Sequence, residues 1–205
     1  MAAKFKNLVT EIDTTGSAQL LLRCTAGKVN LIKNIIVHNE NGSSSSFFLA
    51  FEDNSISTTS FPINAGTTTS GNQAVFTTPF VLEENDEVLL QTSVADQQVT
   101  LHYVELDAGV RQKYRMIGKS LTTADSADSF LTCPAGSTII VNLVNFFNQS
   151  GGTASNNLFT ITDSSTSTTK TIDKGSINNN SAATFHRTFV LESGDSLNFT
   201  PDEQP

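Results

Sequence analysis

The stretch Leu22–Gly27, Leu-Arg-Cys-Thr-Ala-Gly, returns as Leu131–Gly136, Leu-Thr-Cys-Pro-Ala-Gly. A second stretch, Phe80–Glu83, Phe-Val-Leu-Glu, returns as Phe189–Glu192 at the same offset of 109 residues. Further pairs share this offset: Asn39 and Asn148, Gly42 and Gly151, Leu49 and Leu158, Gly66 and Gly175, Phe76 and Phe185, and Asp86 and Asp195. A repeat of this length without a net gap predicts two copies of one domain rather than a solenoid of short units.

The repeat divides the 205 residues into a first domain at 1–108, a linker at 109–113 and a second domain at 114–205. Each half is long enough to bury a core of its own. Cys24 and Cys133 occupy equivalent positions, one in each domain. We therefore expect two buried thiols that are too far apart to bond to each other, in a reducing compartment.

The composition favours strands over helices. Charged residues make up only 16% of the chain, and it contains 14 Phe and no Trp. Ser, Thr and Asn are abundant, and their side chains compete with helical hydrogen bonds. Apolar alternation bounded by turn residues predicts strands at 20–24, 29–37, 47–51, 74–82, 88–91 and 99–106, and again at 139–147, 158–161, 183–191 and 197–200.

These strands predict an all-β protein of two tandem β-sandwiches, of jelly-roll or immunoglobulin-like type. A Ser/Thr-rich loop is expected before Gly66 and before Gly175. The more continuously apolar stretch at 139–147 predicts a strand covered on both faces. The residues expected to be buried are Leu31, Ile35, Val37, Phe80, Leu82, Val144, Phe146, Phe189 and Leu191.

The two copies differ at their ends. Residues 99–106 form a well-alternating strand, whose counterpart at the repeat offset would lie beyond Pro205. We therefore expect the second repeat to lack the last strand of the first. Either residues 114–121 supply another strand, or another subunit covers the edge. On this hypothesis the second repeat carries more of the subunit contact, and the proline-containing tail at 201–205 protects an edge or lies against a neighbour.

The charge balance excludes some partners. The formal net charge is −8, and no basic run stands against it, which disfavours nucleic acid and anionic membranes. The basic cluster of Arg111, Lys113, Arg115 and Lys119 is interpreted as a solvated linker. The first residues lack the apolar region of a signal peptide, and no apolar stretch is long enough to span a membrane.

Two short motifs resemble catalytic or phosphate-binding sequences, but each lacks a residue that the function requires. Gly194–Leu197, Gly-Asp-Ser-Leu, spells the nucleophile block of an esterase class, but no His follows Ser196. The equivalent residues of the first repeat, Asn85–Val88, contain no Ser. Gly118–Ser120 resembles the end of a phosphate-binding loop, but Lys113 stands where its first glycine is required.

Metal and acid–base chemistry is also not predicted. His38, His102 and His186 are widely spaced and have no partner at metal-ligand spacing. Glu83–Glu87 lacks the full pattern of a calcium loop and is interpreted as a solvated acidic turn. Glu83 and Glu192 lie in different domains, too far apart for paired glycosidase carboxylates. No catalytic, cofactor-binding or metal-ligating residue is therefore predicted.

The repeated pattern resembles small β-sandwich modules of accessory virion proteins in tailed bacteriophages. In those modules an Ala-Gly turn precedes an alternating strand, and a Leu-Glu-x-Gly-Asp turn precedes the final strand. The first repeat has Asn85 where glycine is usual. The matching residues are Cys24, Ala26, Gly27, Asn39, Phe80, Val81, Leu82, Glu83 and Asp86, with copies at Cys133, Ala135, Gly136, Asn148, Phe189, Val190, Leu191, Glu192, Gly194 and Asp195.

The resemblance implies a non-enzymatic structural protein of the virion, most simply a capsid decoration or cement protein. A neck, collar or tail accessory protein, including a fibre adaptor, is the alternative within that class. It also implies other virion proteins as partners, a homo-oligomer with a trimer favoured, and assembly in the bacterial cytoplasm. A carbohydrate-binding β-sandwich is the alternative of another class. The absence of Trp weakens it, because Tyr103 and Tyr114 are then the only large rings with a polar group.

Overall fold

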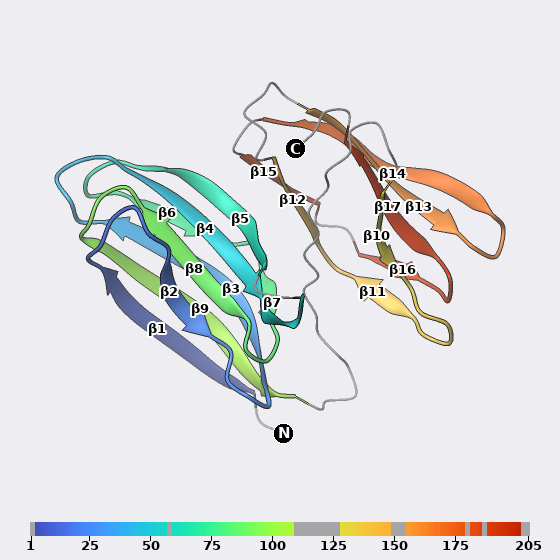
Figure 1. Cartoon of the computed structure of the whole chain (residues 1–205), viewed down its shortest axis with the longest axis horizontal. Helices are drawn as coiled ribbons and strands as arrows, with labels where there is room; N and C mark the ends of the chain where they lie inside the picture. Colours follow the sequence, from blue (N-terminus) through green and yellow to red (C-terminus); the bar gives the residue numbers. More distant parts are fainter. Residues whose placement is uncertain are drawn as a thin grey trace. The chain divides into compact units, whose positions relative to one another are not determined.

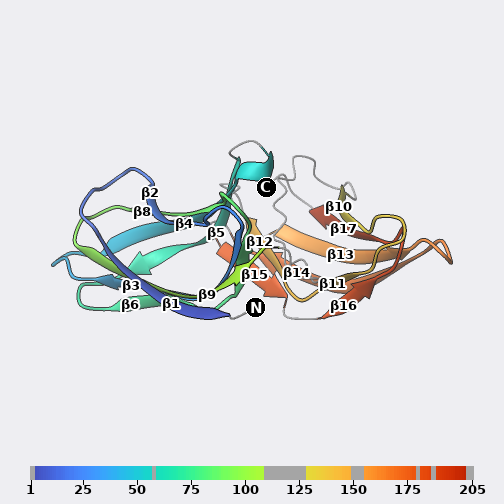
Figure 2. The ribbon, with the colours of Figure 1, turned by 90° about the horizontal axis from the view of Figure 1, so that it is seen from below.

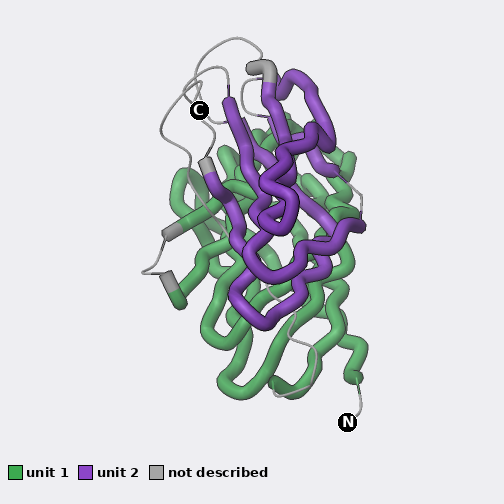
Figure 3. Tube along the Cα trace, turned by 90° about the vertical axis from the view of Figure 1, so that its right-hand side faces the viewer, with its two compact units in different colours: residues 1–118 green, residues 119–205 purple. Residues whose placement is uncertain are grey.

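The computed structural model describes residues 3–56, 59–108, 128–148, 155–178, 181–185 and 188–201. The chain divides into two compact units, residues 1–118 and residues 119–205 (Figure 3). The predicted linker at 109–113, the basic cluster and the expected strand at 114–121 lie outside the described residues, as do His186 and residues 202–205 of the tail. Pro201, the first residue of the predicted tail, instead pairs with Asn157 in a strand ladder.

The first unit consists of strands and one short helical turn. The strands are β1 (Lys4–Ile12), β2 (Gln19–Arg23), β3 (Lys28–Asn39), β4 (Ser45–Asp53), β5 (Thr59–Thr68), β6 (Gln73–Phe76), β7 (Phe80–Leu82), β8 (Glu87–Thr92) and β9 (Gln97–Asp107). A three-residue 3-10 turn, η1 (Asn54–Ile56), follows β4. In the described part of the chain, no helix has the length and apolarity needed to cross a membrane.

The strand order of the first unit is that of a jelly roll. One sheet runs β1-β9-β3-β6, with β7 also paired to β3, and the other runs β2-β8-β4-β5 (Figure 1). The two sheets form the two layers of a sandwich in Figure 2. Antiparallel pairs are nested along the chain: β4 with β5, β3 with β6 and β7, β2 with β8, and β1 with β9. This nesting is that of a long hairpin folded over itself, so of the two predicted sandwich types the first unit is the jelly roll.

The second unit repeats the inner part of this order. Its strands are β10 (Asp128–Thr132), β11 (Ile139–Val141), β12 (Val144–Asn148), β13 (Ser155–Asp163), β14 (Thr168–Ile177), β15 (Ser181–Phe185), β16 (Phe189–Leu191) and β17 (Ser196–Pro201). The nested pairs are β13 with β14, β12 with β15, β11 with β16, and β10 with β17. The predicted all-β fold with two sandwich bodies is confirmed. Counterparts of β1 and β9 are not among the described residues.

Each unit has its own apolar core, and most of the predicted core residues are buried in it. Leu31 and Phe189 are the exceptions, since both are only half-buried. A register shift lies between Ile32 and Asn34 where β3 pairs with β9. Such a bulge reverses the alternation of side chains, so Ile32 is fully buried in place of Leu31.

Four predictions about strands were wrong. The strand expected at 183–191 is divided into β15 and β16, which pair with different strands. The Ser/Thr-rich loops before Gly66 and Gly175 contain the strands β5 and β14, because Thr side chains suit a pleated surface. The strand expected at 74–82 is broken into β6 and β7 around Pro79, which has no N–H to donate. The stretch at 139–147 is divided into β11 and β12, and it is not covered on both faces, because the Ile140 side chain is 61% exposed.

The repeat offset also changes within the fold. Leu49 of β4 stands opposite Leu90 of β8, and in the second unit Phe159 stands opposite Phe199. The structural counterpart of Leu49 is therefore Phe159, and the pairing of Leu49 with Leu158 was wrong. β13 is displaced by one residue relative to β4, and β14 returns to the original offset.

We expect the cores of the two units to be energetically separate. Leu82→Ala and Leu191→Ala each remove a fully buried side chain, and each should destabilise its own unit by about 2–5 kcal/mol. Tyr103 packs against the core of the first unit, so in a Tyr114→Phe background tyrosine fluorescence reports on the first unit alone. Urea unfolding followed by this fluorescence should shift for Leu82→Ala and not for Leu191→Ala, whereas circular dichroism should detect both losses.

Candidate functional site

Two of the repeated stretches meet at one corner of each sandwich; in the first unit they are Cys24–Gly27 and Glu83–Asp86. The Cys24 N–H donates to the Asp86 carbonyl at 2.9 Å, and the Asn85 N–H donates back to the Cys24 carbonyl at 2.9 Å. In the second unit the Cys133 N–H donates to the Asp195 carbonyl at 2.9 Å, and the Gly194 N–H donates to the Cys133 carbonyl at 3.0 Å. Two turns distant in sequence are thus joined.

A buried carboxylate completes each corner. Asp86 Oδ2 accepts the Glu83 N–H at 2.8 Å, and Asp86 Oδ1 accepts the Asn54 N–H at 3.2 Å. At the equivalent place Asp195 Oδ2 accepts the Glu192 N–H at 2.9 Å, and Asp195 Oδ1 accepts the Ser164 N–H at 3.0 Å. Each carboxylate therefore closes its own turn and holds the residue that follows the fourth or the thirteenth strand.

Backbone conformation explains why the turn residues repeat. Gly27 and Gly136 have φ of +71° and +73°, a region that glycine enters without steric cost. Asn85 and Gly194 also have positive φ, +71° and +89°. Asparagine is one of the few other residues that tolerates this conformation, so Asn85 can replace the glycine of the second repeat.

The two thiols are structural at this corner. Cys24 Sγ donates to the Lys28 carbonyl and Cys133 Sγ donates to the Ser137 carbonyl, both at 3.3 Å. Both cysteines are free and buried, as predicted. Burial raises the pKa of Cys24 to about 11, so its sulfur remains a protonated thiol and is a poor nucleophile.

A repeated asparagine links the two sheets at the opposite end of β3. Asn39 Nδ2 donates to the Thr68 carbonyl of β5 at 3.1 Å, and Asn148 Nδ2 donates to the Ile177 carbonyl of β14 at 2.9 Å. Both asparagines are buried, where an unpaired amide would be costly. The side-chain amide therefore joins the layers of each sandwich.

The Glu83–Glu87 stretch is more than a solvated turn. Glu84 Oε2 accepts the Gly27 N–H at 3.0 Å, and Asp86 and Glu87 are buried. Glu87 stands between Arg23 and Glu52 on neighbouring strands, and Arg23 forms an ion pair with it. Burial and the neighbouring Glu87 raise the pKa of Glu52. Asp86 and Glu87 are thus used inside the fold, and among the described residues this stretch does not form a group of carboxylates that could share a cation.

Ser196 occupies the place of Glu87 in the second unit. It stands between Thr132 and Thr162, and its Oγ lies 3.3 Å from Asn198 Oδ1. The carboxylate of the preceding Asp195 is already bound to backbone N–H groups. The Gly-Asp-Ser-Leu sequence is therefore the start of a β-strand rather than a strand-to-helix turn.

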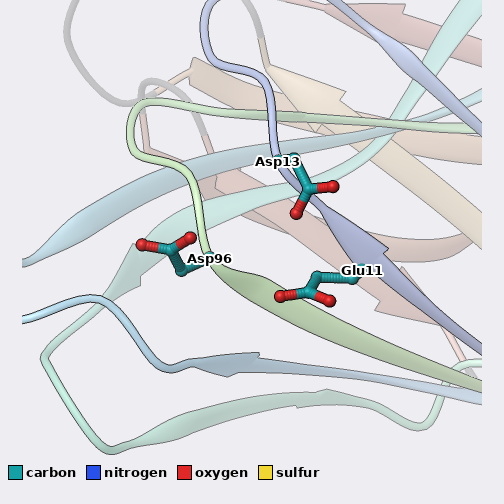
Figure 4. A group of neighbouring side chains, drawn as sticks. All are labelled: Glu11, Asp13 and Asp96. Carbon is teal, nitrogen blue, oxygen red and sulfur yellow. The ribbon is translucent and has the colours of Figure 1, made fainter.

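One group of carboxylates was not recognised in the sequence. Glu11, Asp13 and Asp96 each place an oxygen within 4.8 Å of the others (Figure 4). The pairing of Ile12 with Gln97 brings the group together, so no sequence spacing predicts it. All three side chains are exposed, and Asp96 Oδ2 accepts a bond from Asn41 Nδ2 at 3.2 Å. Exposed acidic groups often gather without an ion, and this group is assigned no ligand.

Comparison with known proteins finds no matching family model and no matching curated protein. Among solved structures, the crystal structure of PBSX exported protein XepA aligns with 98% of this chain and 86% of its own, at 13% identity and a TM-score of 0.27. A putative alpha-L-fucosidase from Bacteroides ovatus aligns with 95% of this chain and 36% of its own, at 11% identity and a TM-score of 0.26. Both TM-scores are too low to establish a shared fold, so function is argued from the residues of this chain.

The two equivalent aspartates should respond to pH in opposite directions. Burial raises the pKa of Asp86 from 3.8 to about 6, against the opposing bonds from Glu83 and Asn54. A raised folded-state pKa adds stability that is present below pH 3.8 and is lost as the pH rises through about 6. Bonds from Ser164 and Glu192 lower the pKa of Asp195, so its contribution is present above 3.8 and is lost as the pH falls.

Asp86→Asn should therefore flatten the fall in stability of the first unit between pH 3.8 and about 6. Urea unfolding followed by tyrosine fluorescence in the Tyr114→Phe background across this window measures it. Asp195→Asn is the matched control, which should leave the fluorescence transition unchanged. An unaltered pH dependence in Asp86→Asn would contradict the assignment.

Ser196→Ala should leave every hydrolytic rate of the purified protein unchanged, because Ser196 lies within a strand ladder. Turnover of short-chain p-nitrophenyl esters measures this. A hydrolytic activity that survives purification and disappears in Ser196→Ala would overturn the structural interpretation of the Gly-Asp-Ser-Leu sequence.

Proposed function

We propose that the protein is a non-enzymatic structural component of a tailed-phage virion, most simply a capsid decoration or cement protein. The observation that carries this proposal is the use of the repeated polar residues. The cysteine, the aspartate and the asparagine of each repeat all bind backbone groups inside their own sandwich. What was duplicated is a scaffold, which suits a role in assembly better than a role in catalysis.

The remaining surface fits such a role. The chain is acidic, with a net charge of −8, which keeps a protein soluble and disfavours contact with packaged nucleic acid. Several large apolar side chains are nevertheless exposed on the outer faces of the sheets: Phe5, Val9, Leu20, Val75, Ile140 and Val190. Exposed apolar side chains on rigid sheets favour contact with other proteins.

The alternative within this class is a neck, collar or tail accessory protein, including a fibre adaptor. The carbohydrate-binding alternative has less support, because sugars stack on exposed aromatic platforms. Tyr103 packs against the core of the first unit, and Phe5 is the exposed large aromatic side chain of the described residues. Other virion proteins as partners, self-association and assembly in the bacterial cytoplasm belong to the same proposal. The trimer stays a prediction from the resemblance.

The test is to purify particles from the strain that carries the gene and to quantify this chain by mass spectrometry against the major capsid protein. A copy number close to that of the capsid protein is expected for a decoration protein. A copy number far below it would indicate the neck or tail, and absence from particles would overturn the proposal. Particles lacking the gene product should lose their DNA at a lower temperature than wild-type particles if it cements the shell.

A further inference from the structure

Strand β1 leaves one long edge of its sheet open. It pairs with β9 through nine consecutive residues, from Lys4 opposite Glu105 to Ile12 opposite Gln97. In the ranges that the structure describes, no strand pairs with its other edge (Figure 1). An open edge presents a row of N–H and C=O groups that can pair with another chain.

Several of the usual protections of an edge strand are absent from β1. The strand has nine residues, contains no proline and pairs with β9 without a register shift. Lys6 lies on the core-facing side with Leu8, where a charge normally discourages pairing. Its Nζ, however, is bound to Glu105 Oε2 at 2.6 Å, so this charge is already neutralised. By contrast β2, an edge of the other sheet, is short and has a register shift between Leu20 and Leu22.

Two of the four outward side chains of β1 are apolar, where a free edge is normally polar. The Phe5 side chain is 85% exposed and the Val9 side chain is 59% exposed. Phe5 stands opposite Val104, which stands opposite Leu31, which stands opposite Val81. An apolar row therefore crosses the sheet and ends at an uncovered phenylalanine on the open edge.

The charges of β1 favour a second copy of the same strand as its partner. Lys4 lies at its start, and Glu11 and Asp13 lie on either side of Ile12, its last residue. A two-fold axis places two copies of one strand antiparallel. The basic end of each copy then lies beside the acidic end of the other, whereas a parallel arrangement would bring like charges together.

We propose that two copies of this protein associate through antiparallel pairing of β1 with β1, centred on Asn7. The outward faces of the two sheets remain continuous only if outward residues stand opposite each other. Centring on Asn7 places Phe5 opposite the partner's Val9, twice in the dimer. Centring on Leu8 would place Phe5 opposite the partner's Glu11. This pairing gives a structural form to the self-association proposed above, and because it needs no other protein it is tested separately from the virion role.

The register is tested with single cysteines in the full chain. Asn7→Cys should form an intermolecular disulfide on mild oxidation, because the two position-7 side chains are directly opposed. Glu11→Cys is the matched control, since its two copies lie about eight residues apart along the strands, or about 26 Å. Cys24 and Cys133 are buried and do not compete. Cross-linking at position 11 that equals cross-linking at position 7 would overturn the register.

The contact itself is tested by light scattering during gel filtration over a dilution series. Wild type should dimerise, or form an even-numbered assembly that contains the dimer. Phe5→Lys and Val9→Glu should each weaken it at least tenfold, and the double variant should recover it, because the two new charges face each other. Leu20→Lys, on β2, should leave it unchanged. A monomeric wild type, or no recovery in the double variant, would overturn the proposal.

Discussion

The bonds between the Cys24 and Asp86 backbones, and their copies at Cys133 and Asp195, hold the rest of each sandwich in register. They join the turn after one strand to the turn before the strand that pairs with it. In a nested hairpin the inner pairs form locally, but the pair β2 and β8 must meet across more than sixty residues. The bonds between the two turns offset part of the conformational entropy that is lost when this long loop closes. The buried carboxylate fixes the register of the turns, because its oxygens must be met by N–H donors at defined positions.

The same corner sits in two electrostatic environments. In the first unit burial disfavours the ionised form of Asp86, and Asp53 and Glu83 add like charge around it. In the second unit the Ser164 N–H and hydroxyl stabilise the Asp195 carboxylate. Backbone geometry is thus held constant while the burial of the carboxylate and its side-chain hydrogen bonds differ. The fold therefore depends on hydrogen-bond geometry at this point more than on net charge.

Sequence reasoning predicted many of the features that repeat, because turn residues and buried leucines are local requirements of the chain. It did not predict features that arise only from pairing. Because of the bulge beside Ile32, Ile32 rather than Leu31 is buried in the core. Because β13 is displaced by one residue, Phe159 rather than Leu158 is the structural counterpart of Leu49. The Glu11, Asp13 and Asp96 group exists only because β1 lies beside β9. Strand β1 itself was missed, because its lysines and exposed Phe5 conceal the alternation of a buried strand.

Because the sandwich is duplicated, features found in both units can be distinguished from features found in the first unit alone. The corner, the inter-sheet asparagine and the nested pairs occur in both units, so they are explained by folding alone. Strands β1 and β9, the Lys6–Glu105 ion pair and the exposed Phe5 belong to the described part of the first unit only. Folding of the duplicated sandwich does not require an exposed phenylalanine on an unprotected edge, and water disfavours it. A contact between chains gives that residue a physical reason to be there.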